Sequence, residues 1–222
     1  MNLRTLAVLL VLAGPAAAAS APAKATVSAD EALSRLKAGA KRFATGHSKH
    51  HEYMAQVHAT AAGQHPFAAV LGCMDSRVGP EIVFDQGIGD LFALRVAGNV
   101  ADPDALGGLE YAVKVVGTKL IVVLGHTHCG AVKGACDGVE LGNLTGLLAQ
   151  LKPAVDSVPA DVQPRNSSNE AFIDQAARAN VLLAIKTIRE KSPVLAELEK
   201  TGGLKLVGAM YDVETGKTEF LE

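Results

Sequence analysis

Two short apolar runs in this sequence each end in residues that can bind a metal ion. The run 67–72 is followed by Cys73. The run 120–125 is followed by His126 and, three residues later, by Cys129. Nearly all-apolar runs of this length are typical of strands buried on both faces of a parallel sheet. Because ligands of such sheets bind beyond the carboxyl ends of the strands, we expect these three side chains to meet at one edge.

Two cysteines and one histidine form a donor set that favours zinc. Thiolate sulfur and imidazole nitrogen select zinc over magnesium or calcium. Three protein ligands leave one tetrahedral position open, as in catalytic rather than structural zinc sites. A structural disulfide between Cys73 and Cys129 is the alternative for an exported protein. That alternative gives no role to His126, nor to the acid and the base that follow Cys73.

The acid and the base are Asp75 and Arg77, in the segment Cys-Met-Asp-Ser-Arg. An arginine at hydrogen-bonding distance keeps a carboxylate ionised, and an ionised carboxylate can accept a hydrogen bond that orients a nucleophile. An ordinary ion pair is the simpler interpretation of these two residues. A third interpretation makes Asp75 a fourth zinc ligand, which would close the site.

The motifs Cys-x-Asp-Ser-Arg and His-x-x-Cys together resemble those of the beta-class carbonic anhydrases, and the similarity runs from about Ser28 to the C-terminus. This resemblance implies reversible hydration of carbon dioxide to bicarbonate and a proton. It implies that Cys73, His126 and Cys129 bind one Zn²⁺ per subunit. It also implies that Asp75 and Arg77 are the catalytic dyad, which orients a zinc-bound hydroxide.

The resemblance also implies a substrate site. One position matches a side-chain donor to substrate oxygen, and others match an apolar pocket for carbon dioxide, in which Ala97 replaces a residue that is often valine. Val70 occupies the position of a tryptophan that belongs to a regulatory bicarbonate site in one branch of the family, which argues against that site here. The predicted substrate-binding residues are Gln64, Phe92, Ala97, Gly98 and Tyr111.

Strand-like and helix-like segments alternate along the chain, which predicts a single α/β domain with a mainly parallel central sheet. Ser28 and Glu31 form a capping box that begins a helix. The turn 214–217 predicts a final antiparallel edge strand. Other strands are expected at 90–96 and 204–212, and other helices at 106–116, 131–135, 141–155 and 170–190. The resemblance adds N-terminal helices that pack on a partner subunit.

The beginning of the chain predicts export. Residues 1–19 combine a positive start, an apolar stretch and small residues at Ala17–Ala19, as in a cleaved signal peptide. The apolar stretch is too short to span a bilayer. We expect residues 20–27 to be a flexible leader and residues 28–222 to be the catalytic domain. The mature protein is then periplasmic or secreted from a bacterium, without a membrane anchor.

Composition and charge limit the partners. The formal net charge of −2 gives no reason to expect nucleic acid or an anionic membrane surface. Only 4% of the residues are aromatic, so aliphatic side chains must form the core. The resemblance implies carbon dioxide and bicarbonate as the small-molecule partners. By the resemblance, a second copy of the chain is expected as well, in a homodimer or in a dimer of dimers, which is a homotetramer.

Three other functions fit part of the pattern. Hydrolysis of carbon disulfide or carbonyl sulfide would use the same zinc site, and access to the pocket would decide between these substrates. A non-catalytic zinc-binding protein would need neither Asp75, Arg77 nor Gln64. A zinc dehydrogenase would need a Gly-x-Gly-x-x-Gly motif after a strand, which is absent from the sequence.

Several residues have less specific interpretations. His47, His50, His51 and His58 suggest a solvated face rather than a metal-binding tract, because no thiol or carboxylate pair lies at ligand spacing. Cys136 is expected to be a small buried apolar residue. His128 is either a proton relay or an outward-facing residue without a role.

Overall fold

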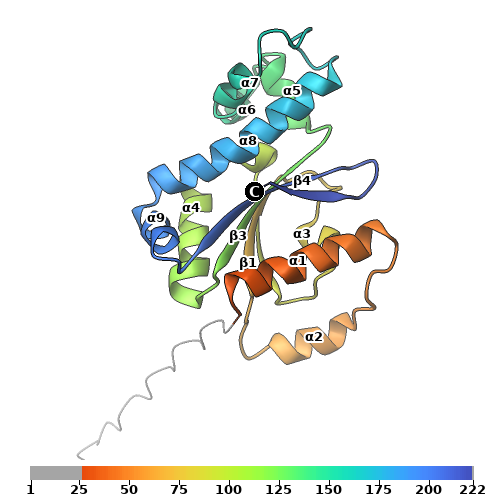
Figure 1. Cartoon of the computed structure of the whole chain (residues 1–222), viewed down its shortest axis with the longest axis vertical. Helices are drawn as coiled ribbons and strands as arrows, with labels where there is room; N and C mark the ends of the chain where they lie inside the picture. The colour runs from red at the N-terminus through yellow and green to blue at the C-terminus, as the bar shows by residue number, and fades with distance from the viewer. Residues whose placement is uncertain (1–26, 222) are drawn as a thin grey trace, which may run out of the picture.

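The computed structural model describes residues 27–221, so the predicted signal peptide at 1–19 and nearly all of the predicted leader lie outside the described residues. A five-stranded sheet in the order β2-β1-β3-β4-β5 occupies the centre (Figure 1). Four strands are parallel, and the last runs antiparallel to β4. The predicted α/β class, with its mainly parallel sheet and antiparallel edge strand, is confirmed. The strands are β1 (Ala68–Gly72), β2 (Leu91–Arg95), β3 (Leu120–His126), β4 (Lys205–Tyr211) and β5 (Thr218–Leu221).

The two apolar runs form the middle of the sheet. Every residue of β1 and β3 is buried, as expected for strands that are covered on both faces. Gly72 pairs with Leu124 in a parallel register. The segments that begin at Cys73 and His126 therefore leave the sheet at the same edge.

Helices cover both faces of the sheet (Figure 1). Side chains of α4 to α9 pack with Leu71 and Val123 on one face. Side chains of α1 and α3 pack with Val70 and Val122 on the other. The helices are α1 (Ala29–Ala44), α2 (Tyr53–Thr60), α3 (Pro80–Val83), α4 (Pro103–Glu110), α5 (Gly130–Cys136), α6 (Gly142–Ala149), α7 (Lys152–Ser157), α8 (Glu170–Lys191) and α9 (Pro193–Lys200). No helix within residues 27–221 is long and apolar enough to span a bilayer.

The N-terminal helices differ in how they pack. Ser28 caps α1, because its Oγ accepts a hydrogen bond from the Glu31 amide at 3.2 Å. Leu36 and Ala40 bury one face of α1 against the sheet of the same chain. In contrast, α2 has no buried residue. Packing of these helices on a partner subunit remains a prediction.

The helix boundaries depart from the sequence-based expectation in three places. The expected helix at 141–155 is two helices, because α6 ends at Ala149 and α7 begins at Lys152, with Pro153 in its first turn. The expected helix at 106–116 starts earlier, as α4, and continues as a π-helical turn over Tyr111–Val116. The sequence-based expectation missed α9, which begins after Ser192 with Pro193 in its first turn.

Candidate metal centre

The structure brings the three predicted metal ligands together. The two Sγ atoms and a ring nitrogen of Cys73, Cys129 and His126 all lie within 4.8 Å of one another. The residues are 4%, 2% and 1% exposed, respectively. Both cysteines are free thiols, so the alternative of a disulfide between them is not formed here. The cluster is at the carboxyl edge of β1 and β3, as the apolar runs predicted.

His126 presents one ring nitrogen to this cluster. Its Nδ1 lies 2.8 Å from the Thr127 carbonyl oxygen, so Nδ1 carries the proton and donates a hydrogen bond to that oxygen. Its Nε2 is buried and has no hydrogen-bond partner. A buried polar atom without a partner is unfavourable, and a metal ion beside the two cysteines would satisfy the free lone pair. The donor set and the unpartnered nitrogen therefore fit zinc.

The two thiols compete for ionisation when no cation is bound. A hydrogen bond from the Cys129 thiol is the main cause that lowers the pKa of Cys73, and the Gly98 amide adds to it. The neighbouring Cys73 sulfur raises the pKa of Cys129 far above its ordinary value, and burial raises it further. A divalent cation would resolve this conflict, because it stabilises both thiolates at once.

Arg77 holds Asp75 beside the cluster through two parallel hydrogen bonds. Nε of Arg77 lies 3.0 Å from Oδ1 of Asp75, and an Nη lies 2.8 Å from Oδ2. The Arg77 amide also donates to Oδ1, at 2.9 Å. These bonds hold the pKa of Asp75 well below its ordinary value. Oδ2 lies 3.9 Å from His126 Nε2, so an ionised carboxylate borders the position that a metal would occupy.

Arg95 supports the same segment, and the sequence-based reasoning missed it. It lies at the end of β2, opposite Gly72 in the sheet. Its Nε donates to the Cys73 carbonyl oxygen at 3.0 Å, and an Nη donates to the Asp75 carbonyl oxygen. The only signal in the sequence is an arginine at the end of a neighbouring strand, which does not reveal its partners.

The predicted substrate residues fall into separate places. Gly98, next to Ala97, lies at the cluster, since its amide donates to Cys73 Sγ at 3.3 Å. The rings of Phe92 and Tyr111 contact each other edge to face, with centroids 6.0 Å apart.

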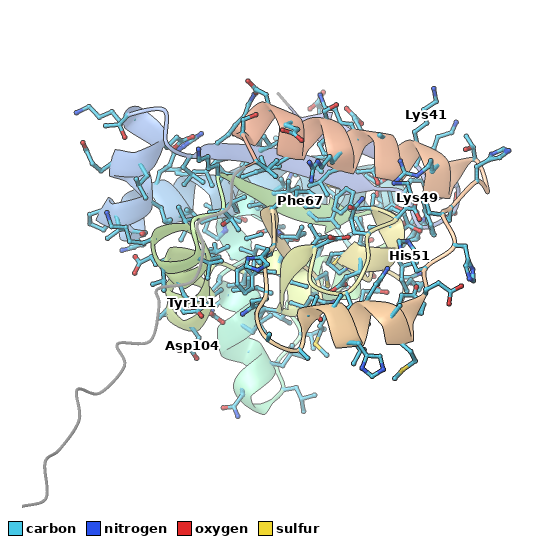
Figure 2. The ribbon with its side chains drawn as sticks, turned by 90° about the horizontal axis from the view of Figure 1, so that it is seen from below. Lys41, Lys49, His51, Phe67, Asp104 and Tyr111 are labelled. Carbon is cyan, nitrogen blue, oxygen red and sulfur yellow. The ribbon has the colours of Figure 1, made fainter. Side chains whose placement is uncertain are left out.

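Phe92 pairs with Ala69 in the sheet, four residues before Cys73. Four residues of strand span roughly 13 Å, so this aromatic pair is not adjacent to the metal ligands of its own chain. Tyr111 is 47% exposed and is labelled at one side of the molecule in Figure 2.

Gln64 lies apart from the metal ligands of the same chain. It is exposed and precedes β1, whereas Cys73 follows β1, so the two residues belong to opposite edges of the sheet. A contact between Gln64 and a substrate at the cluster would therefore require a second subunit. The structure of one chain leaves this predicted role open.

His128 adopts a left-handed backbone conformation, with φ of +54°. Its ring lies between two carboxylates, with Nδ1 3.0 Å from Glu170 and Nε2 3.1 Å from Glu214. Its carbonyl oxygen accepts a hydrogen bond from Arg77 at 3.5 Å. These contacts fix His128 at the surface beside Asp75 and Arg77. They favour neither a proton relay nor a residue without a role.

The remaining candidates lie away from the cluster. His47, His50 and His58 are exposed, as expected for a solvated face. His51 differs, because it is partly buried and contacts Asp85 at 3.2 Å. Cys136 packs against the core but is half-buried rather than buried as expected, and burial raises its pKa to about 11.

Comparison with known proteins identifies the family. The family model described as carbonic anhydrase matches residues 68–218. Carbonic anhydrase 2 of Mycobacterium tuberculosis is 38% identical over 183 residues, which are 82% of this chain and 87% of that protein. The carbonic anhydrase of Mycolicibacterium smegmatis is 35% identical, over 83% of this chain and 89% of that protein. The crystal structure of the beta-carbonic anhydrase CafA of Aspergillus fumigatus has a TM-score of 0.69 and 30% identity, over 87% of this chain and 90% of that one. This chain belongs to the beta-class carbonic anhydrases.

Proposed function

We propose that this chain hydrates carbon dioxide reversibly to bicarbonate and a proton, with one zinc ion held by Cys73, His126 and Cys129. Membership of the family supports the reaction. One observation carries the metal assignment: three buried soft donors lie within 4.8 Å, and one of them is a nitrogen with no other partner.

In this proposal the metal activates the nucleophile, and side chains of the protein orient it. When bound, zinc acidifies a coordinated water, so that a nucleophile exists at neutral pH. The Asp75 carboxylate can accept hydrogen bonds at neutral pH, because Arg77 keeps it ionised. Its Oδ2 faces the cluster and can accept a hydrogen bond from the attacking group, which directs a lone pair toward the substrate carbon. Asp75 and Arg77 therefore orient the reacting group, and neither needs to change its own protonation state.

The substrate site is proposed to need two subunits. Ala97 and Gly98 border the cluster within one chain, whereas Gln64, Phe92 and Tyr111 do not. A partner subunit would bring an amide donor and an apolar surface to the open side of the cluster, which suits an apolar substrate and an anionic product. The beta-carbonic anhydrases of Sordaria macrospora, which are 27% identical with a TM-score of 0.63, are described as tetrameric. We propose a dimer or a dimer of dimers for this chain.

The location of the enzyme is a separate proposal. The pattern at 1–19 supports export and cleavage before Ser20. Expression of the whole chain in a Gram-negative host, followed by fractionation and mass spectrometry, tests it. We expect a periplasmic protein that begins at Ser20, and an uncleaved protein in the cytoplasm would contradict the proposal.

The function is tested by zinc content and by stopped-flow hydration of carbon dioxide, measured on the same preparation. Cys129→Ser should lose zinc and activity together, because two protein ligands cannot hold the ion tightly. Cys136→Ser is the matched control, since Cys136 lies outside the cluster, and it should keep both. A Cys129→Ser protein with full zinc and full rate would disprove the assignment.

A further inference from the structure

A polar side chain lies within the apolar face of α8. Asn180 is 3% exposed, and its neighbours on this face, Ala176, Ala177 and Ala184, belong to the core. Its Nδ2 donates to the Gly98 carbonyl oxygen at 2.6 Å. Asparagine is a poor residue for the interior of a helix, and a buried amide loses its hydration. The hydrogen bond to Gly98 is a specific interaction that an apolar residue could not provide.

Gly98 links Asn180 to the metal centre. The amide of the same glycine donates to Cys73 Sγ at 3.3 Å. Two hydrogen bonds therefore run in series from α8, through one residue, to a predicted metal ligand. Asn180 and Cys73 are 107 positions apart in the sequence, so no local motif contains this arrangement.

The turn that carries Gly98 depends on its surroundings. It is a 3₁₀ turn over Ala97–Asn99, in which Gly98 has φ of +67° and Asn99 has φ of +45°. A Cβ on Gly98 would lie 2.9 Å from Leu151, so the glycine is also packed closely against the residue that precedes α7. Gly98 adopts this left-handed conformation without steric cost, whereas Asn99 does so less readily, so the neighbouring structure must maintain the turn. The Asn180 amide provides such a restraint, at the carbonyl oxygen between these two residues.

We infer that Asn180 is a positioning residue for the metal centre: it holds Gly98 so that the Gly98 N–H points at the Cys73 sulfur. An N–H donor to a metal-bound thiolate withdraws charge from sulfur and fixes its direction. Partners of this kind, outside the ligands themselves, change metal affinity or activity by about 10–100-fold when they are removed. This inference rests on the proposed role of Cys73 as a metal ligand.

Cobalt(II) is the probe that separates positioning from general stability, because thiolate ligation gives it a sulfur-to-metal charge-transfer absorption. The reduced, metal-free protein is titrated with Co²⁺ in competition with a chromophoric chelator. Asn180→Leu removes the donor and keeps the branched shape of the side chain, although leucine is larger. Thr118→Val is the matched control: it removes a buried hydrogen bond, from Thr118 to the Ala112 carbonyl oxygen, that does not involve the cluster.

We expect Asn180→Leu to bind Co²⁺ about 10–100-fold more weakly than the unmodified protein and to shift its charge-transfer band. We expect Thr118→Val to melt at a lower temperature but to keep the cobalt affinity and the band unchanged. If Asn180→Leu does not fold, Asn180→Ala is measured in the same way, because it truncates the side chain without adding a new contact.

Two results would overturn the inference, and they differ in what else they affect. If the Asn180 variant lowers the melting temperature as Thr118→Val does, but keeps the cobalt affinity and the band, then Asn180 has only a structural role. If the unmodified protein shows no thiolate-to-cobalt absorption, the proposed metal site fails, and this inference fails with it.

Discussion

Asp75 shows how one neighbour can set the chemistry of a side chain. Arg77 contacts both carboxylate oxygens and thereby holds the pKa of Asp75 well below its ordinary value of 3.8. A depressed pKa in the folded state means that the ionised form stabilises the protein above pH 4. This contribution is lost only as the pH falls through the lower folded value. Loss of activity in mild acid would therefore come from protonation of other groups, such as the metal ligands.

Asp75→Asn should keep zinc but reduce hydration by about 100-fold, because the amide loses acceptor capacity and the attacking group loses its orientation. The deficit should be similar from pH 6 to pH 9, since Asp75 is ionised throughout that range. Zinc analysis and stopped-flow rates at several pH values measure both effects. Near-normal turnover by the zinc-loaded variant would remove the orienting role from Asp75.

We expect the two cysteines of the metal centre to be sensitive to oxidation when the metal is removed. Without metal, the neighbouring Cys129 thiol lowers the pKa of Cys73, which favours the reactive thiolate, and the two sulfur atoms lie close together. Chelation in air should therefore join them in a disulfide, with oxygen as the oxidant, and leave Cys136 as the one free thiol. Thiol titration and mass measurement follow the change, and zinc should restore activity only after reduction. Full recovery on zinc addition without a reductant would show that the disulfide does not form.

At the scale of elements, the strands could be predicted well because their signal is local. The runs before Cys73 and His126 are apolar throughout, and the structure buries every residue of β1 and β3. The parallel register of β1 and β3 then brings Cys73 and His126 together, although they are 53 positions apart in the sequence. This part of the site follows from the rule that parallel strands end at one edge.

Other parts of the site could not be predicted because they depend on contacts between distant elements. Arg95 supports Cys73 from the adjacent strand, and Asn180 reaches Gly98 from α8. Their residue types carry no chemical signature without their partners. Gln64 and Tyr111 matched the family pattern, but their distance from the cluster in one chain became visible only in three dimensions.

The buried Asp85, which follows α3, joins α1 to the connection between α1 and α2 and is expected to stabilise the N-terminal region. The Asp85 carboxylate contacts Arg42, His51 and the Lys49 amide. Figure 2 labels His51 and Lys49 beside this connection. Burial alone would raise the pKa of Asp85, but hydrogen bonds from Arg42 and His51 outweigh it and lower the pKa. The stabilisation should therefore be present near neutrality and be lost in acid, as the pH falls through the folded value.

Asp85→Asn should lower the free energy of unfolding by about 2 kcal/mol at pH 7, because Arg42 and His51 lose a charged acceptor. Asparagine tolerates the positive φ of +49° at this position, so backbone strain is not the cause. Urea unfolding at pH 7 and at a pH well below the ordinary pKa of 3.8 measures the change, which should be smaller in the acid. Asp30→Asn, which removes an exposed ion pair with Lys205, is the control and should have no measurable effect. Equal stabilities of Asp85→Asn and the unmodified protein would contradict the prediction.

At the scale of the whole molecule, one chain has its metal ligands at one edge of the sheet and Gln64 at the other. It also exposes the apolar residues Tyr53, Met54 and Val57 on α2. Both features agree with the proposed assembly, in which each chain completes the site of its partner. Light scattering should therefore find a dimer or a tetramer.

Mixed dimers test whether Gln64 acts across the interface. Gln64→Ala and Asp75→Asn should each be impaired as homodimers. A heterodimer purified with two different tags should regain about half of the unmodified activity, because one of its two sites then has both residues intact. Activity no higher than the mean of the two homodimers would show that Gln64 does not act in the partner's site.

The central claim is that carbon dioxide is hydrated at the zinc ion bound by Cys73, His126 and Cys129. The most direct measurement is a zinc titration of the reduced, metal-free protein, with the hydration rate followed by stopped flow at each step. The account predicts a rate that rises in proportion to bound zinc and reaches its limit at one equivalent per chain. A fully zinc-loaded protein whose hydration rate does not exceed that of the uncatalysed reaction would contradict it.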